Sequence, residues 1–133
     1  MAMDRHQPVP SRESPFKGKT GMARLINAFG YSIDGLRAAF RHEDAFRQLV
    51  LLALVLIPLA FVVHAAPLAR ALLVASSLAT LIIELLNSAI EAAVDHTSLE
   101  RHPLAKRAKD MGSAAQLLGL INLAVVWGLV LFG

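Results

Sequence analysis

The sequence predicts an all-α membrane protein with three transmembrane helices, preceded by an amphipathic helix that lies in the membrane interface. The first observation is the absence of Asp, Glu, Lys and Arg between Arg47 and Arg70, and again from Met111 to Gly133. Each of these stretches is long enough to contain the roughly 20 apolar residues that cross a bilayer. The second observation is that 56% of the residues are hydrophobic and 17% are charged, against about 45–50% and 25% in soluble proteins.

The N-terminal part of the chain is expected to stay outside the membrane. Residues 1–20 contain three prolines and few large apolar side chains, so we expect a disordered cytoplasmic tail. From 22 to 41 the apolar residues recur at steps of three and four, and cationic residues fill the other faces, which favours an interfacial helix. Gly30 and Gly35 weaken this helix, and a break there is possible. The apolar positions are Leu25, Phe29, Ile33, Leu36 and Phe40.

The three crossings are expected at 45–66, 67–95 and 112–132, which makes 21–133 a single membrane domain. Pro58 should kink the first crossing or be accommodated by neighbouring helices. Twelve of the thirteen Lys and Arg residues precede the first crossing or lie between the second and third, and Arg70 is the exception. The positive-inside rule therefore places the N-terminus and the second loop in the cytoplasm and the C-terminus in the periplasm. This distribution also explains the basic composition, so nucleic-acid binding is not expected.

Polar side chains form one stripe along the second half of the second crossing. Glu84, Asn87, Ser88, Glu91 and Asp95 follow one another at helical spacing and so share a face. Glu84 and Glu91 are two turns apart, about 10 Å along the axis. Ionisable residues inside a membrane segment are costly and mark functional sites. A helix that simply leaves the membrane would explain Asp95, but neither Glu84 nor the shared face.

Acidic and basic side chains gather at the cytoplasmic edge of the predicted crossings. Carboxylates without thiolates favour a hard cation such as Mg²⁺, which usually arrives with substrate phosphates, and Arg and Lys would hold those phosphates. Glu84 is the deepest acid and the candidate general base for a hydroxyl, which at that depth belongs to a lipid. These residues predict phosphoryl transfer from a water-soluble donor to a membrane alcohol, with a small transporter as the competing interpretation. The acids are Glu43, Glu84, Glu91, Asp95, Glu100 and Asp110, and the cations are Arg24, Arg37, Arg47, Lys106, Arg107 and Lys109.

Two stretches, Glu84–Asp95 and Ala108–Ala115, closely resemble the signatures of the prokaryotic diacylglycerol kinase family. Gly35–Phe40 and Glu43–Gln48 match its N-terminal pattern, and the resemblance extends over Gly21–Gly133. It implies a homotrimer in the bacterial inner membrane whose active sites are shared between subunits. The implied activity is transfer of the γ-phosphate of MgATP to diacylglycerol, which gives phosphatidic acid.

The resemblance also implies roles for individual residues. Glu84 would be the catalytic carboxylate that acts on the lipid hydroxyl, and Glu43 and Glu91 would bind Mg²⁺. The implied nucleotide contacts are Arg24, Tyr31, Glu43, Glu91, Glu100, Arg101, His102, Lys109 and Asp110. The implied lipid contacts are Glu84, Asn87, Ser113, Arg37, Phe46 and Arg47.

Two other functions compete with diacylglycerol phosphorylation. A related branch of the same fold phosphorylates undecaprenol, and Met111-Gly112-Ser113 is more like the diacylglycerol branch. The second alternative is a non-enzymatic membrane protein, either a small transporter or an assembly scaffold.

Overall fold

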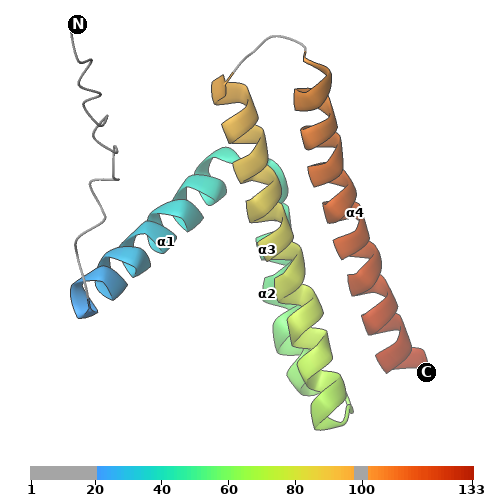
Figure 1. The fold of residues 1–133 in the computed structure, drawn as a ribbon. Coiled ribbons are helices and arrows are strands. Elements are labelled where there is room, and N and C mark those ends of the chain that lie inside the picture. Colours follow the sequence, from blue (N-terminus) through green and yellow to red (C-terminus); the bar gives the residue numbers. More distant parts are fainter. Residues whose placement is uncertain (1–20, 98–101) are drawn as a thin grey trace, which may run out of the picture. The chain divides into compact units, whose positions relative to one another are not determined.

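The computed structural model describes residues 21–97 and 102–133, and almost all of them are helical. The helices are α1 (Met22–His42), α2 (Asp44–Val62), α3 (Pro67–Thr97) and α4 (Pro103–Phe132) (Figure 1). Strands are absent from these described ranges, so the all-α prediction is confirmed. The expectations for residues 1–20, and for nucleotide contacts at 100 and 101, fall outside the described residues.

The chain divides into two units, Met1–Gly35 and Leu36–Gly133. The boundary falls within α1, which is nevertheless one uninterrupted helix. The break that Gly30 and Gly35 made possible is therefore not present. In the first unit, the apolar side chains of Leu25 and Phe29 are exposed, as an amphipathic helix for the membrane interface requires.

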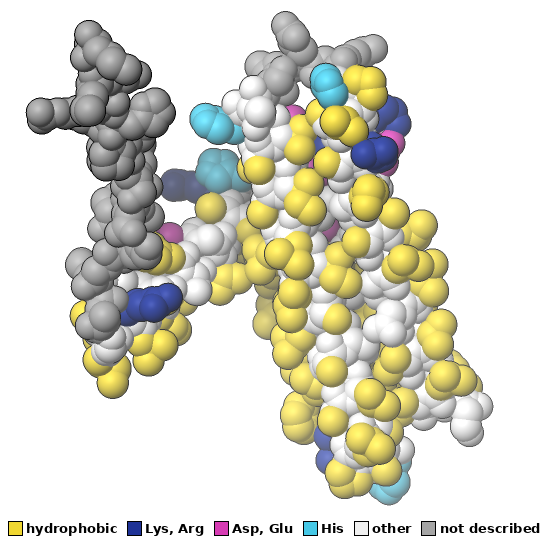
Figure 2. Space-filling model, viewed as in Figure 1, with side chains coloured by type: hydrophobic (Ala, Val, Ile, Leu, Met, Phe, Trp, Pro, Cys, Tyr) yellow, Lys and Arg dark blue, Asp and Glu magenta, His cyan; other side chains and the backbone are white. Residues whose placement is uncertain are grey.

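In the second unit, α3 lies between α2 and α4 and packs against both, and successive helices run in opposite directions (Figure 1). All three helices are long and apolar enough to cross a membrane. Figure 2 shows hydrophobic side chains over most of the visible surface of these helices, with charged side chains and histidines gathered at their ends. This distribution suits helices whose middle parts contact lipid and whose ends meet water.

A small apolar core joins the three helices near the α2–α3 connection. It contains Ala60, Leu73, Leu123 and Trp127. The indole Nε1–H of Trp127 donates to Ser77 Oγ at 3.3 Å, and the Ser77 hydroxyl donates to the Leu73 carbonyl at 2.7 Å. Buried polar groups in a membrane need such internal partners, because lipid offers them none.

Arg70 fixes the α2–α3 connection and explains where α2 ends. Its guanidinium donates to the carbonyls of Ala60 at 3.2 Å and Ala65 at 3.3 Å. The last carbonyls of a helix have no partner within the helix, and a cation there also complements the helix dipole. Val63 is extended, with φ −66° and ψ 145°. The helix therefore ends at Val62, inside the stretch 45–66 that the sequence predicts to cross the membrane.

The start of α4 is fixed by the residues that precede and begin it. His102 precedes the helix, and its Nδ1 accepts the Leu104 amide hydrogen at 3.2 Å. Pro103 occupies the first turn, where its fixed φ suits a helix start. The helix thus begins well before Gly112, the expected start of the third crossing.

Two glycines let α3 and α4 approach each other closely. A Cβ atom on Gly112 would lie 2.2 Å from Asn87 Oδ1, and one on Gly119 would lie 2.7 Å from Ile83 Cδ1. Small residues at a helix contact allow this approach in membranes. Gly112 is buried in this contact, whereas the small residues that follow it, Ser113, Ala114 and Ala115, are exposed.

The first prediction concerns these glycines. Gly112→Ala should lower the free energy of unfolding by about 1–3 kcal/mol, because the added methyl must displace the buried amide oxygen of Asn87. Gly119→Ala should cost less, since the tip of Ile83 can rotate away. Gly128→Ala is the matched control, as a Cβ there meets nothing within 4 Å. Unfolding in mixed micelles with increasing SDS measures the stability of the three variants. A Gly112→Ala variant as stable as Gly128→Ala would contradict the prediction.

Candidate active site

The polar stripe of α3 runs from a buried acid to an exposed one. Glu84 is 5% exposed. Asn87, Ser88 and Glu91 are half-buried, and Asp95 near the end of the helix is exposed. The predicted stripe is confirmed as one segment of a continuous helix. Its gradient of burial matches a site that accepts a lipid group at its deep end and a soluble group at its exposed end.

Two further carboxylates lie near enough to Glu84 for their charges to act on it. The negative charges of Glu91 and Glu43 are the charges that act on Glu84. Glu43 is the residue that precedes α2, where its extended backbone, with φ −112° and ψ 111°, separates α1 from α2. Its charge is close enough to act on Glu84, so Glu43 lies near the stripe of α3.

The carboxylate set fits a hard cation shared with a phosphate ligand. Like charges in a partly buried place repel each other unless a proton or cation is present. Among the described residues, no group of three or more His, Cys, Asp or Glu is arranged to hold a metal by itself. Mg²⁺ commonly takes only one or two protein carboxylates, with water and substrate phosphates completing its octahedron. Glu43 and Glu91, whose charges both reach Glu84, are the carboxylates that would fill this role.

Two side-chain amides lie beside the carboxylates in the contact between α3 and α4. Asn87 Nδ2 donates to Glu91 Oε1 at 3.4 Å, and Asn87 Oδ1 is packed against Gly112. Asn87 Oδ1 and Gln116 Oε1 are both buried and accept no hydrogen bond from any described residue. Gln116 was not among the predicted site residues. The signal that points to it is its spacing, because Gly112, Gln116 and Gly119 fall on one face of α4.

The exposed end of the stripe carries ion pairs. Lys109 Nζ lies 2.9 Å from Asp95 Oδ1 and so links α4 to α3. Lys109 is also close enough to Glu91 for their charges to interact. Asp110 pairs with Lys106 one turn away on α4. Cations and acids therefore alternate where a soluble, highly charged substrate would arrive.

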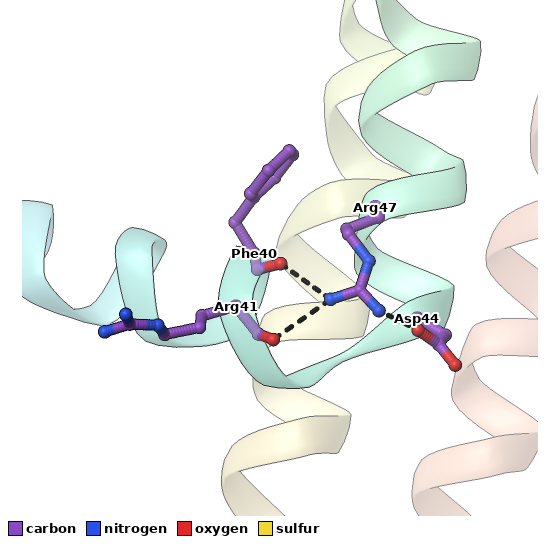
Figure 3. A network of polar contacts seen from close by, with 4 residues as sticks. All are labelled: Phe40, Arg41, Asp44 and Arg47. Atoms are coloured by element: carbon purple, nitrogen blue, oxygen red, sulfur yellow. Dashed lines mark hydrogen bonds and ion pairs between the residues drawn. The ribbon is translucent and has the colours of Figure 1, made fainter.

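Arg47 is engaged in the turn between α1 and α2. One of its guanidinium nitrogens donates to the carbonyls of Phe40 at 2.9 Å and Arg41 at 3.1 Å (Figure 3). The other pairs with Asp44. These contacts satisfy the last carbonyls of α1 and hold the turn that carries Glu43. The expected lipid contact of Arg47 stays a prediction beside this structural role.

The other predicted site residues are spread over α1, α2 and the N-terminal half of α4. Phe46 is 3% exposed and buried on α2, while Arg37 and Ser113 are exposed on α1 and α4. His102 caps α4. Arg24 and Tyr31 belong to the unit Met1–Gly35 and are exposed there. Within the second unit, the structure therefore gathers Glu43, Glu84, Asn87, Glu91 and Lys109.

The sequences of several known proteins are similar to this chain over most of its length. Residues 30–131 match the family model described as prokaryotic diacylglycerol kinase. The chain is 61% identical to the diacylglycerol kinase of Pseudomonas aeruginosa, over 90% of this chain and 98% of that protein. It is 51% identical to the enzyme of Helicobacter pylori strain 26695, over 87% and 90% of the two chains. It is 45% identical to the enzyme of Escherichia coli strain K12, over 85% and 93%.

The match includes α2, α3 and all but the last residue of α4, and therefore the whole acidic stripe. It also includes Glu43, which the turn after α1 brings to that stripe. With the family model spanning most of the residues and the relatives covered almost from end to end, the chain belongs to the prokaryotic diacylglycerol kinase family.

Proposed function

We propose that this protein transfers the γ-phosphate of ATP to the hydroxyl of diacylglycerol and releases phosphatidic acid and ADP. The observation that carries the proposal is the burial of Glu84 on a helix long enough to cross a membrane, with Glu43 and Glu91 acting on it. An acid at that position serves a reaction in which a membrane-embedded hydroxyl loses its proton. The relatives named diacylglycerol kinase support the same reaction.

Glu84 is the group that accepts the proton. The hydroxyl oxygen of the lipid forms a bond to the γ-phosphorus, the bond from that phosphorus to the β–γ bridging oxygen breaks, and ADP leaves with the bridging oxygen. The hydroxyl proton passes to the Glu84 carboxylate. Because Glu84 is buried and Glu91 lies two turns nearer the end of α3, the lipid and the nucleotide reach the site from opposite directions.

Mg²⁺ would be held by Glu43 and Glu91. When bound, it neutralises charge on the nucleotide phosphates. Other residues of the chain position the Glu91 carboxylate and the nucleotide. Asn87 donates to Glu91 at 3.4 Å and orients its carboxylate, and Lys109 supplies positive charge at the exposed end of the stripe. The remaining predicted nucleotide contacts, Arg24, Tyr31, Glu100, Arg101, His102 and Asp110, belong to this proposal as well.

We propose that the active enzyme is a homotrimer in the bacterial inner membrane. The N-terminus and the α3–α4 connection face the cytoplasm, because twelve of the thirteen Lys and Arg residues belong to those parts of the chain. A single chain leaves Glu43 and Glu91 half-buried and many large apolar side chains of α2 exposed. Neighbouring protomers would shield these carboxylates from lipid, at a site that the subunits share.

The second prediction tests the substrate. We expect purified protein with radiolabelled ATP to phosphorylate diacylglycerol in mixed micelles at a kcat/KM about tenfold or more above that for undecaprenol. Thin-layer separation of the labelled lipids measures both products. Preferential labelling of undecaprenol would move the protein to the other branch of the fold, and labelling of neither lipid would favour the transporter or scaffold.

The third prediction concerns the metal. Glu91→Gln should lower kcat/KM by about 100-fold and raise the Mg²⁺ concentration needed for half-maximal rate, because one carboxylate ligand is lost. Asn122→Leu is the control, since Asn122 is exposed on α4 and has no role assigned in the site. Titration of Mg²⁺ at fixed ATP measures both variants, after cross-linking has shown that each still assembles. An unchanged Mg²⁺ dependence in Glu91→Gln would contradict its role as a ligand.

A further inference from the structure

Lys109 lies on the face of α4 that is turned toward α3. Its neighbours at helical spacing on that face are Ala105, Ala108 and Gly112, and these four residues are less exposed than the residues between them. Because the three neighbours are small, the helices can lie close together here and the long side chain of Lys109 can cross to α3. Its Nζ atom donates to Asp95 Oδ1 at 2.9 Å. The lysine thus bridges the two helices at the exposed end of the stripe.

Two carboxylates of α3 attract the Lys109 ammonium. Asp95 is the one that is bonded to it. Glu91 lies one turn earlier on the same face of α3, and its charge also acts on Lys109. Glu91 is half-buried, whereas Asp95 is exposed, and a charge pair is screened less where it is more buried. If Asp95 did not hold the ammonium, Glu91 would therefore be its nearest strong partner.

The other neighbour of Glu91 on this face is Asn87, one turn earlier again. Asn87 Nδ2 donates to Glu91 Oε1 at 3.4 Å. A neutral amide orients a carboxylate without cancelling its charge. Glu91 therefore has a neutral donor on one side and, on the other, a cation that is bonded to Asp95. This arrangement leaves the negative charge of Glu91 available to another cation.

We propose that Asp95 is a positioning residue, which holds the Lys109 ammonium away from Glu91 and so keeps the Glu91 carboxylate free for Mg²⁺. This inference rests on the proposed function, in which Glu91 is a metal ligand and Lys109 faces the nucleotide. An ammonium paired with Glu91 would occupy oxygen atoms that the metal needs, and its charge would repel the metal. Held by Asp95, the same ammonium can still neutralise the nucleotide phosphates.

The fourth prediction is that Asp95→Asn weakens metal binding by about tenfold, because Lys109 then turns to Glu91. Mn²⁺ replaces Mg²⁺ as the probe, and electron paramagnetic resonance measures free Mn²⁺ with the full-length protein in micelles and a non-hydrolysable ATP analogue. Asp95→Glu keeps the carboxylate and should retain most of the affinity. In a Lys109→Met background, Asp95→Asn should change the Mn²⁺ affinity by no more than about twofold, because the competing ammonium is gone.

Thr97→Val is the matched control for changes at the end of α3. Thr97 is exposed there, and its hydroxyl donates to the Ala93 carbonyl of the same helix at 2.8 Å. This variant should bind Mn²⁺ as tightly as the wild type.

Three results would overturn the inference. The first is wild-type Mn²⁺ affinity in Asp95→Asn. The second is an equal loss with and without Lys109, which would mean that Asp95 attracts the metal directly. The third is loss of the assembled protein, seen by cross-linking, in both Asp95→Asn and Lys109→Met, which would make the ion pair a structural contact. Unchanged Mn²⁺ affinity in Glu91→Gln would instead reject the proposed metal ligand, which is a separate result.

Discussion

The structure depends on keeping a carboxylate away from hydrocarbon. Glu84 is one of the few polar side chains that are buried among the described residues, and it lies on a helix that is apolar enough to cross a membrane. An ionised carboxylate facing acyl chains would cost several kcal/mol, so α3 must be covered where Glu84 points. The position of α3 between α2 and α4 provides this cover (Figure 1). Gly112 and Gly119 contribute by allowing α4 to lie close against α3.

The same constraint links the fold to the chemistry. Burial of Glu84 requires two neighbouring helices, and the turn before α2 brings Glu43 to the same place. That turn is held by Arg47, which binds the last carbonyls of α1 (Figure 3). At the far end, Arg70 performs the equivalent task for α2. Two arginines thus fix the ends of α2, and α2 in turn fixes one of the three carboxylates.

The sequence was sufficient to predict what depends on local spacing. Apolar lengths identified the three long helices, and steps of three and four identified the stripe from Glu84 to Asp95. Features that depend on contacts between distant residues were not predictable. Arg70 ends α2 through carbonyls that the apolar pattern does not reveal, and the approach of Glu43 to Glu84 depends on the turn after α1. Gln116 is not singled out by the sequence, since the buried state of its oxygen depends on how α4 packs.

The measurement that tests the central claim most directly is the turnover of Glu84→Gln at saturating MgATP and diacylglycerol, with ATP binding measured on the same sample. If Glu84 accepts the hydroxyl proton, kcat should fall by about 10²–10⁴-fold, and ATP affinity should stay close to that of the wild type because Glu84 lies at the lipid end of the stripe. A variant that keeps kcat within tenfold of the wild type would contradict the role given to this buried acid.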